Sequence, residues 1–458
     1  MAGYSFDQDD VERTHSTVFA TPYRGTTVGS DLRRRLDQDH QLYYARARWS
    51  EADQFFDDGA LTISLQRVEE TEDRIRRSGA ALLQGFQLWT TGADLQLLSR
   101  TRFGTLTYGF DYYHDDVNSF GRNRAPGGAG WVSSTRGPIA DDASYDLLGL
   151  YLQDELRPTP RLGLTAGLRY TSAWASANDV DPDPNDALVF GPVDEHWDDL
   201  VGSFGSSWEV WDGLRLFGSV AMGFRAPNLS DLTRFDVARS GEVERPAPDL
   251  EPEEYTQYEI GLKARAGRSE GQLAYFYTSI HNQIERFPTG EISPDGAVVE
   301  KANVGDGHAE GIELSARHAV GEGFSIFGSI AWIAGELDTF VGPSAKEERD
   351  RLSRLPPTTA LLGLRWDSVD ARYFAEATAV LVDEADRLSP EDERDVQRIP
   401  PGGLPGYTIY YLRGGARIAE SLRLTAALEN LTNKDYRILG SGLNEPGWNL
   451  VVGLDVAF

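Results

Sequence analysis

Cysteine is absent from this chain of 458 residues, and methionine occurs only twice. A disulfide framework and a thiolate metal site are therefore excluded, and the scarcity of methionine argues against a Met-rich copper site. No apolar run approaches the length of a transmembrane helix, which excludes a helical membrane protein. A membrane β-barrel stays compatible, because its strands interleave apolar with polar residues and keep the mean hydropathy low, here −0.41.

Basic residues are also in short supply: 44 Lys and Arg face 72 Asp and Glu, for a net charge of −28. Nucleic acid selects basic patches, so we expect no nucleic-acid partner. The first residues, MAGYSFDQDDVERTHS, offer neither a basic n-region nor an apolar h-region, so no signal peptide is visible. An exported barrel needs one, which leaves a fragment, a mis-started product or a protein that is not exported.

The last eleven residues, WNLVVGLDVAF, alternate between two kinds of side chain. A period of two places alternate residues on opposite faces of one strand. This pattern predicts a strand with one face in lipid and the other toward a polar lumen, although the edge strand of a soluble sandwich would read alike. The expected lipid-facing set is Trp448, Leu450, Val452, Leu454, Val456 and Phe458.

Similar alternation recurs through most of the chain, in roughly 17 segments, and a weaker segment near 12–21 would make about 18. We therefore predict an all-β antiparallel barrel. Charged residues at the inward positions indicate a wet lumen, since a small filled barrel could not hold so many ions. They are Arg169, Glu259, Lys263, Glu313, Arg317, Arg365 and Glu376.

The connections between these segments alternate between long and short. Outer-membrane barrels have long outside loops and short periplasmic turns, whereas a soluble sandwich has no reason to sort loops in this way. The pattern therefore predicts extracellular loops on one side and a periplasmic C-terminus. The expected loops include 114–143, 175–198, 224–253, 282–308, 336–356, 382–406 and 432–446.

Several segments resemble one known family in their order and spacing. GFRAPNLSDL at 223–232 precedes LEPEEYTQYEIGLKA at 250–264, and NVGDGHAEGIELSAR at 303–317 precedes RLPPTTALLGLRW at 354–366. The strongest match is LENLTNKDYRILGSGLNEPGWNLVVGLDVAF at 428–458. Over about residues 40 to 458, the chain resembles the TonB-dependent outer-membrane receptors.

This resemblance implies a barrel of about 22 strands, closed by an N-terminal plug, that takes up a scarce ligand such as an iron–siderophore complex. Nothing before residue 12 matches a plug or a TonB box, so we expect a C-terminal portion with about 17–18 strands. We divide it into 1–39, a remnant or weak first strand and loop, and 40–458, the barrel.

The partners that the resemblance implies are outer-membrane lipid, a small-molecule or metal-chelate ligand, the TonB complex through a plug not in this chain, and the barrel assembly machinery. The machinery would recognise the strand 448–458. A passive plugless pore is the main alternative, and a barrel enzyme is a lesser one. No G-x-S-x-G elbow is present, so we expect no enzymatic activity and no cofactor.

The FRAP motif, which comprises Phe224, Arg225, Ala226 and Pro227, ends one expected strand. In haem-uptake members of the family, a related motif flanks a loop with a ligand-binding His. No His lies between 225 and 249 here, and imidazole is the usual haem ligand. The motif is therefore predicted to shape a strand end, as turn chemistry suggests. An anionic siderophore would need converging cations such as Arg225, Arg234 and Arg245.

Two acidic stretches lie in expected loops. NDVDPDPND at 178–186 supplies carboxylates at close spacing, which makes Ca²⁺ a hypothesis, although the EF-hand pattern fails and a solvated loop is the alternative. Its candidate ligands are Asp179, Asp181, Asp183 and Asp186. The second stretch, 383–398, would be a solvated loop or a short helix. The seven scattered histidines suggest no metal site.

Overall fold

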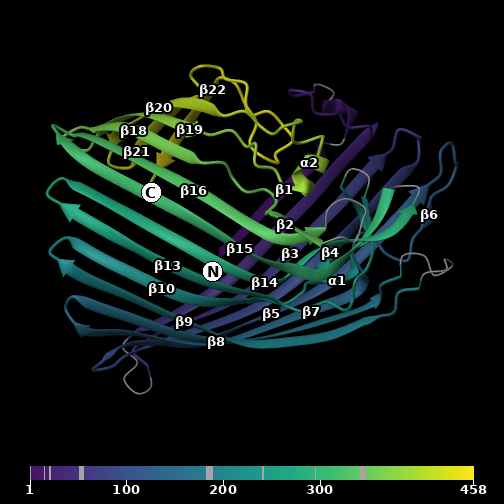
Figure 1. Ribbon diagram of the computed structural model, residues 1–458, viewed down its shortest axis with the longest axis horizontal. Helices are drawn as coiled ribbons and strands as arrows, with labels where there is room; N and C mark the ends of the chain where they lie inside the picture. The colour runs from purple at the N-terminus through teal and green to yellow at the C-terminus, as the bar shows by residue number, and fades with distance from the viewer. Residues whose placement is uncertain are drawn as a thin grey trace.

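The computed structural model describes residues 2–14, 16–19, 22–50, 56–181, 189–239, 242–293, 296–340 and 347–457. Strands dominate it, and they belong to a single sheet (Figure 1). Helical structure is limited to a 3₁₀ turn, Thr17–Phe19, and two short helices, α1 (Leu229–Thr233) and α2 (Pro390–Arg394). None of the helices in the described residues is long and apolar enough to cross a membrane.

In the described residues, four of the 22 strands are short side strands, and the remaining 18 form a wall in which each strand pairs antiparallel with the next. The side strands are β6 (Val132–Ser133), β11 (Asp236–Arg239), β12 (Glu242–Glu244) and β17 (Glu347–Arg351). The first half of the wall contains β1 (Ala2–Glu12), β2 (Arg33–Ser50), β3 (Asp58–Ile75), β4 (Ala81–Arg100), β5 (Gly104–Arg124), β7 (Asp141–Thr159), β8 (Leu162–Asp179), β9 (Val193–Trp211) and β10 (Leu214–Arg225). The second half contains β13 (Glu253–Ala266), β14 (Ser269–Ser293), β15 (Gly296–Gly321), β16 (Phe324–Phe340), β18 (Thr359–Asp367), β19 (Tyr373–Val382), β20 (Tyr407–Ala419), β21 (Leu422–Glu429) and β22 (Asn449–Val456).

The register of the wall carries apolar side chains from strand to strand on the outer face. Leu450 of β22 lies opposite Leu428, and Leu428 lies opposite Leu412. These side chains are solvent-exposed along the outer surface, with Leu450 at 66% and Leu454 at 63%. A ring of exposed apolar side chains is what a lipid-facing wall requires. The all-β antiparallel barrel predicted from the alternation is confirmed.

The inner face carries charges that pair across strands. Arg169 of β8 donates two hydrogen bonds of 2.8 Å to the carboxylate of Asp111 on β5. Arg365 of β18 lies 3.3 Å from Glu376 on the adjacent β19. Both pairs lie on the inner face, where the alternation predicts Arg169, Arg365 and Glu376, so the lumen is polar and these charges are paired across strands.

Aromatic rings cover glycines on the inner face of the wall. Each ring lies directly opposite a glycine of the neighbouring strand, and a Cβ on that glycine would lie 2.2–2.5 Å from a ring carbon. Such pairing compensates for the missing glycine side chain and fixes the register. Four such pairs lie between β10 and β20: Phe217 with Gly261, Phe276 with Gly311, Phe327 with Gly363 and Phe374 with Gly415.

The expected loops agree with the observed connections at most positions, with two corrections. The predicted loop 282–308 is wrong, because β14 and β15 continue their ladder to Ser293 and Gly296. Irregularities in register at three points break the period-two pattern while the hydrogen bonding continues. The weak strand predicted near 12–21 is also wrong, since the strand is Ala2–Glu12 and a 3₁₀ turn follows at Thr17–Phe19.

The first strand was misplaced because its apolar residues face the lumen. Tyr4 lies opposite Leu42 and its ring contacts the inward His40 at a centroid distance of 6.0 Å. The other face of β1 presents Gly3, Ser5 and Asp7, which gives no lipid-facing signal. The wall therefore includes residues before position 40, because β1 pairs with a strand β2 that begins at Arg33.

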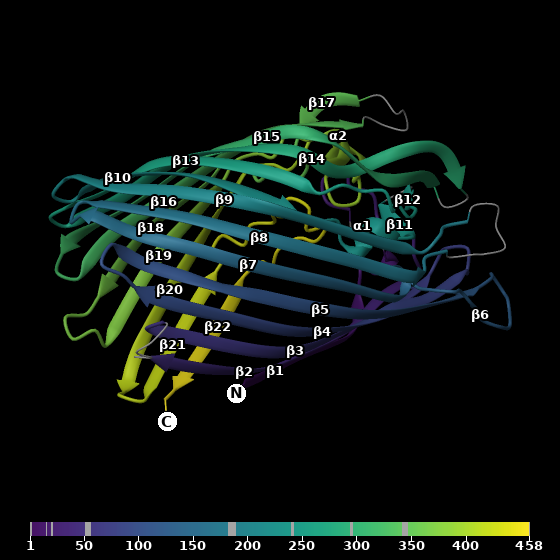
Figure 2. The same ribbon diagram turned by 90° about the horizontal axis from the view of Figure 1, so that it is seen from below.

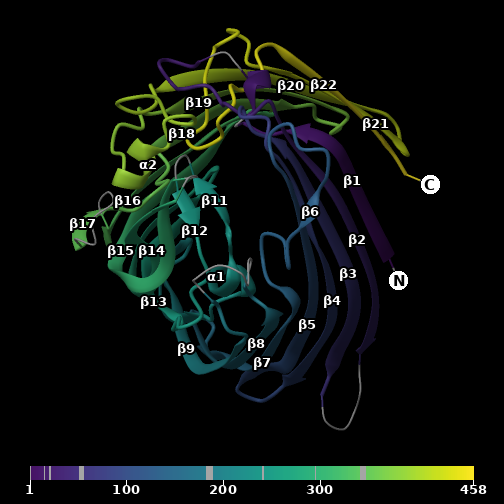
Figure 3. The same cartoon turned by 90° about the vertical axis from the view of Figure 1, so that its right-hand side faces the viewer.

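The two edges of the wall, β1 and β22, lie on the same side of the molecule (Figures 2 and 3). They share no ladder in the described part of the chain. β1 starts at the end with the short turns, and β22 finishes there, so the two edges run antiparallel. Direct pairing would therefore be antiparallel, and any strands between them must come in an even number.

We predict that Gly363→Ala lowers the stability of the barrel by about 1–3 kcal/mol, because the new methyl group would collide with the Phe327 ring. Urea unfolding in detergent, followed by the heat-modifiable shift in gel mobility, measures this effect. Gly205→Ala is the matched control, since the nearest atom to its Cβ, Ser219 Cβ, is 3.8 Å away. Equal destabilisation by both variants would contradict the role of the aromatic ring.

Candidate functional site

The connection between β10 and β13, residues 226–252, folds into the barrel at the end that carries the long loops. In Figure 3, which looks from that end, α1, β11 and β12 lie inside the ring of strands. We call this segment the inner loop. Leu229 and Leu232 of α1 share one side of the helix, where a spacing of three residues places them. They pack in a buried apolar cluster with Val117, Ala143, Ala175, Ala177 and Val193 of the wall.

Polar contacts hold the end of α1 against the connection between β5 and β7. Arg136, only 2% exposed, donates a 2.6 Å hydrogen bond to the carbonyl oxygen of Thr233. The Thr233 hydroxyl in turn accepts the N–H of Ala140 at 3.0 Å. Burial lowers the pKa of Arg136 to about 10. The guanidinium is still charged at neutral pH, so the inner loop is attached by a buried cation as well as by apolar packing.

The FRAP motif holds the base of the inner loop. Arg225, the last residue of β10, donates to Glu253, the first residue of β13, and lies 2.7 Å from Asp231 of α1. Glu253 also accepts the Tyr255 hydroxyl at 2.6 Å and the Ile284 N–H at 2.8 Å. One guanidinium therefore joins two strand ends and a helix.

The remainder of the motif shapes the same junction. Ala226 and Pro227 are buried, and Asn228 caps α1 by accepting the N–H of Asp231 at 2.9 Å. Asp231 returns the contact by accepting the N–H of Asn228 at 3.2 Å, which completes a capping box. The helix begins at Leu229 because this box satisfies its first free N–H groups.

We predict that Arg225→Gln destabilises the folded barrel by roughly 1–3 kcal/mol, because the Glu253 carboxylate keeps its burial and loses its cation. Thermal unfolding in detergent measures the loss. Arg161→Gln is the control with the same change in charge, since Arg161 forms an exposed ion pair with Asp212 in a short turn. If the two variants unfold at the same temperature, the FRAP arginine does not hold the junction.

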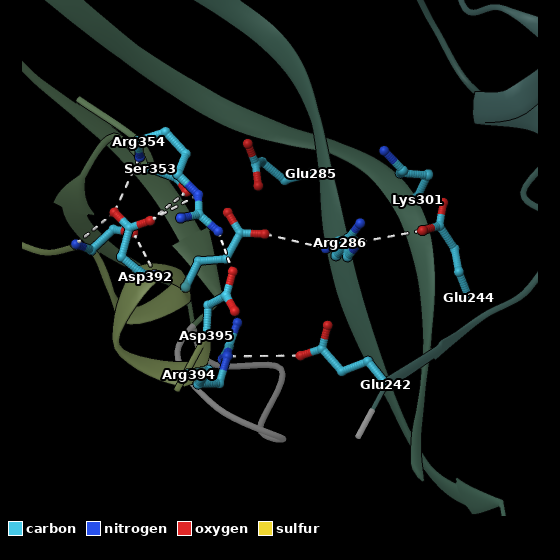
Figure 4. Close-up of polar contacts among 12 residues, drawn as sticks. Glu242, Glu244, Glu285, Arg286, Lys301, Ser353, Arg354, Asp392, Arg394 and Asp395 are labelled. Atoms are coloured by element: carbon cyan, nitrogen blue, oxygen red, sulfur yellow. Dashed lines mark hydrogen bonds and ion pairs between the residues drawn. The ribbon is translucent and has the colours of Figure 1, made fainter. Parts of the chain in front are cut away.

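A network of ion pairs connects the inner loop with the connection between β19 and β20 (Figure 4). We call it the interloop network. Arg286 of β14 lies at its centre, 3.3 Å from Glu244 of β12 on one side and 3.3 Å from Glu391 of α2 on the other. Glu244 is 1% exposed. A second contact joins the same two segments, since Arg394 of α2 lies 3.7 Å from Glu242 of β12.

The α2 side of the network is anchored by Arg354, in the connection between β16 and β18. Its guanidinium contacts Asp392 at 3.3 Å and also Asp395. Asp392 accepts the Arg354 N–H at 3.1 Å and the Ser353 hydroxyl at 3.3 Å. Arg398 is 3.1 Å from Asp395. Three segments far apart in the sequence therefore meet through paired charges at the mouth of the lumen.

Asp395 gives the network a pH dependence. Burial raises the pKa of its carboxyl, but Arg398 and Arg354 outweigh burial and hold the pKa below the ordinary 3.8. Its stabilising contribution is therefore complete above pH 3.8 and is lost as the pH falls through the lowered value.

We predict that acidification below pH 4 lowers the unfolding temperature less in Asp395→Asn than in the parent protein. Scanning calorimetry between pH 6 and pH 3 tests this, and identical pH profiles would contradict it.

The β12 strand also joins the inner loop to the wall. It pairs parallel with β15, with Glu242 opposite Ala297 and Glu244 opposite Val299. Arg245 continues this attachment, since its guanidinium lies 2.9 Å from Glu300 and 3.1 Å from Glu291. Through β12, the inner loop therefore adds a short strand to the β14–β15 hairpin.

The segment between β1 and β2 is attached to the last two long connections. The buried Tyr23 ring packs against Ala385, Leu404 and Leu439, and the Arg437 guanidinium lies 4.7 Å from its centroid. The N–H of Thr27 donates to the carbonyl oxygen of Val396 at 2.8 Å. These contacts span the gap between the edges of the wall at the loop end, where the strands share no ladder.

The cations considered for an anionic ligand do not converge on one free site. Arg225 and Arg245 are held by carboxylates as described, and Arg234 lies 3.9 Å from Asp236. Of the four Ca²⁺ candidates, Asp179 and Asp181 are described, and Asp183 and Asp186 lie outside the described residues. In the part of the chain that the structure describes, no group of three His, Asp or Glu could hold a metal ion. The Ca²⁺ hypothesis stays a prediction.

The expected assembly strand lies at the edge of the wall as β22. Its apolar set is exposed on the outer face, consistent with the predicted orientation, and Phe458 lies outside the described residues. Its recognition by the assembly machinery stays a prediction. Sequence reasoning missed the interloop network, although the acidic stretch 383–398, which contains α2, was noted as a loop or short helix.

The comparison with protein families decides the identity of the barrel. The model of the TonB dependent receptor-like beta-barrel matches residues 2–431. The chain belongs to the TonB-dependent receptor family. Its barrel is therefore an outer-membrane barrel, and the predicted membrane location is confirmed.

Curated relatives of this family member are named for different molecules. Hemoglobin-haptoglobin utilization protein B of Neisseria meningitidis serogroup A is 25% identical over 306 residues, which are 60% of this chain and 37% of that protein. The vitamin B12 transporter BtuB of Photobacterium profundum is 24% identical over 287 residues, 62% of this chain and 41% of that protein. The chain thus spans about two fifths of the length of these relatives.

Solved structures agree on the fold. The copper transporter OprC superimposes with a TM-score of 0.74 at 17% identity, covering 92% of this chain and 66% of that chain. The hemophore receptor HasR of Serratia marcescens superimposes with a TM-score of 0.71 at 16% identity, covering 93% and 66%. All these proteins are named as receptors or transporters, but their ligands differ.

Proposed function

We propose that this member of the TonB-dependent receptor family forms the outer-membrane barrel for energised uptake of a scarce ligand, such as an iron–siderophore complex. The observation that carries the proposal is the inner loop. A segment packed inside the ring, joined by ion pairs to a second loop, forms a cover at the mouth of a polar lumen. Such a cover suits a receptor that recognises a ligand before admitting it.

The proposed partners follow from the family. A small-molecule or metal-chelate ligand would bind among the long loops, and the TonB complex would act through a plug domain. Outer-membrane lipid would surround the apolar ring, and the barrel assembly machinery would recognise β22. We propose no catalytic role, since BtuB and OprC among the compared proteins are named as transporters.

The interloop network is the proposed control point for access to the lumen. Arg286 connects Glu244 of the inner loop to Glu391 of α2, so a ligand that enters between these segments must break one of its two contacts. Because the charges are paired with one another, ligand groups must compete with carboxylates for the same guanidinium.

Uptake assays in outer-membrane vesicles or whole cells that lack other receptors test the proposal. The protein is expressed with whatever plug-coding sequence precedes it in frame, and cells receive labelled ferric siderophores, haem or cobalamin, with and without an uncoupler of the proton-motive force. We expect accumulation of one ligand that the uncoupler abolishes. We further expect Arg286→Gln to change its KM several-fold, with Arg161→Gln as the control.

Two outcomes would contradict the proposal. Steady conductance of the purified chain in planar bilayers, together with uptake that the uncoupler does not affect, would indicate a passive pore. Hydrolysis of lipid or peptide that one Ser, Asp or His substitution abolishes would indicate an enzyme.

A further inference from the structure

A second polar cavity lies on the inner wall at the opposite end of the barrel, beside the short turns. Its volume is about 660 Å³, and strands β10, β13, β14, β15 and β16 provide its wall. We call it the short-turn pocket. Its inward polar side chains are Glu209, Arg215, Lys263, Arg265, Glu270, Gln272, Ser315, Arg317 and Ser329.

Two cations of the short-turn pocket lie directly opposite each other. Arg215 of β10 and Lys263 of β13 are register partners in an antiparallel ladder. Like charges at directly opposite positions repel, so this arrangement costs stability unless an anion lies between them. Glu209 lies 3.6 Å from Arg215, on the side away from Lys263, because β9 and β13 flank β10.

Lys263 and Arg317 have no carboxylate within ion-pair distance among the described residues. The Lys263 ammonium lies 5.3 Å from the centroid of Phe217, and its register partner on β14 is the neutral Gln272. Arg317 donates to the Ser325 hydroxyl at 3.0 Å. The register partner of Arg317, Glu270, instead forms a 3.1 Å ion pair with Arg265.

This pattern differs from that at the mouth of the lumen. Arg225, Arg245, Arg286 and Arg354 are all held by carboxylates at 3.3 Å or less. The whole chain carries a net charge of −28, so its overall field repels anions. The short-turn pocket differs, because four cations (Arg215, Lys263, Arg265 and Arg317) line it against two carboxylates (Glu209 and Glu270), which leaves a local excess of positive charge.

Neutral donors complete the chemistry of the short-turn pocket. Gln272 lies opposite Ser315, and Ser315 lies opposite Ser329, which gives a row of amide and hydroxyl groups beside the cations. Cations next to neutral donors are the arrangement that binds oxyanions through charge-assisted hydrogen bonds.

We propose that the short-turn pocket binds a small multivalent oxyanion, with phosphate or clustered carboxylate groups, between Arg215, Lys263 and Arg317. The site lies at the other end of the lumen from the interloop network and does not require ligand uptake. The bound oxyanion is either a free anion or an anionic group of a transported ligand. Both offer the same chemistry to these three side chains.

Titration of the purified chain in nanodiscs with inorganic phosphate tests the proposal. Calorimetry at low ionic strength avoids screening of the partly exposed cations. We expect saturable binding that sulfate competes for and chloride does not. Lys263→Gln and Arg317→Gln should each weaken phosphate binding about tenfold, because each removes a charge-assisted contact. Lys263→Arg should retain it.

Arg372→Gln provides the matched control, since Arg372 lies in the turn between β18 and β19 and pairs with Asp370 at 3.6 Å. It changes the net charge equally outside the pocket and should leave phosphate affinity unchanged. If a Lys263 variant fails to fold, Ser315→Ala supplies the second test, with weaker binding expected at unchanged charge.

Absence of saturable phosphate binding, or equal weakening by Arg372→Gln, would overturn the proposal. Titration with a transported ligand that carries phosphate or carboxylate groups distinguishes the two sources. Competition between that ligand and phosphate would assign the site to the ligand, and its absence would assign it to the free anion. A negative uptake assay leaves these outcomes unaffected, so the two proposals fail separately.

Discussion

Hydrocarbon offers no partner to a backbone N–H or C=O group, so a chain that crosses it must satisfy each group internally. The antiparallel ladder meets this constraint between β1 and β22, leaving only the outer edges of these two strands without a ladder partner among the described residues. Register then decides which side chains share a face. Leu450, Leu428 and Leu412 are register partners on three successive strands, so their apolar side chains form a continuous band across the outer surface. The same register places Arg169 beside Asp111 inside the ring.

Charge inside the barrel is divided between its two ends. At the mouth, arginines and carboxylates neutralise one another and join segments that are distant in sequence. Such pairs cost desolvation, so their value lies in fixing one arrangement of the loops more than in adding stability. Beside the short turns, Lys263 and Arg317 have neutral donors as neighbours, while other arginines there pair with carboxylates. The strongly acidic composition therefore hides a local excess of positive charge that no average over the chain reveals.

Alternation in the sequence was sufficient to predict the barrel, the wall positions of Arg169 and Arg365, and most loops. The prediction failed where the backbone hydrogen bonding continues but the side chains no longer alternate with a period of two. Between Ile280 and Ile292, irregular register keeps the ladder while breaking the pattern. In β1, the aromatic residues Tyr4 and Phe6 face the lumen, so no lipid-facing signal exists. The network around Arg286 was not predictable, because pairing between residues 244, 286 and 391 depends on how two loops fold over the strand β14.

The parallel ladder between β12 and β15 makes the inner loop part of the hairpin that projects from the wall. A loop attached to the barrel only at its two ends could move independently of the wall. The inner loop cannot, because its strand β12 is hydrogen-bonded to β15 of the wall. Clearing the passage must therefore either unzip three residues of β12 or carry the whole hairpin along. Substitutions in β14 far from any cargo would then alter admission, and their effects would combine non-additively with those in the cover.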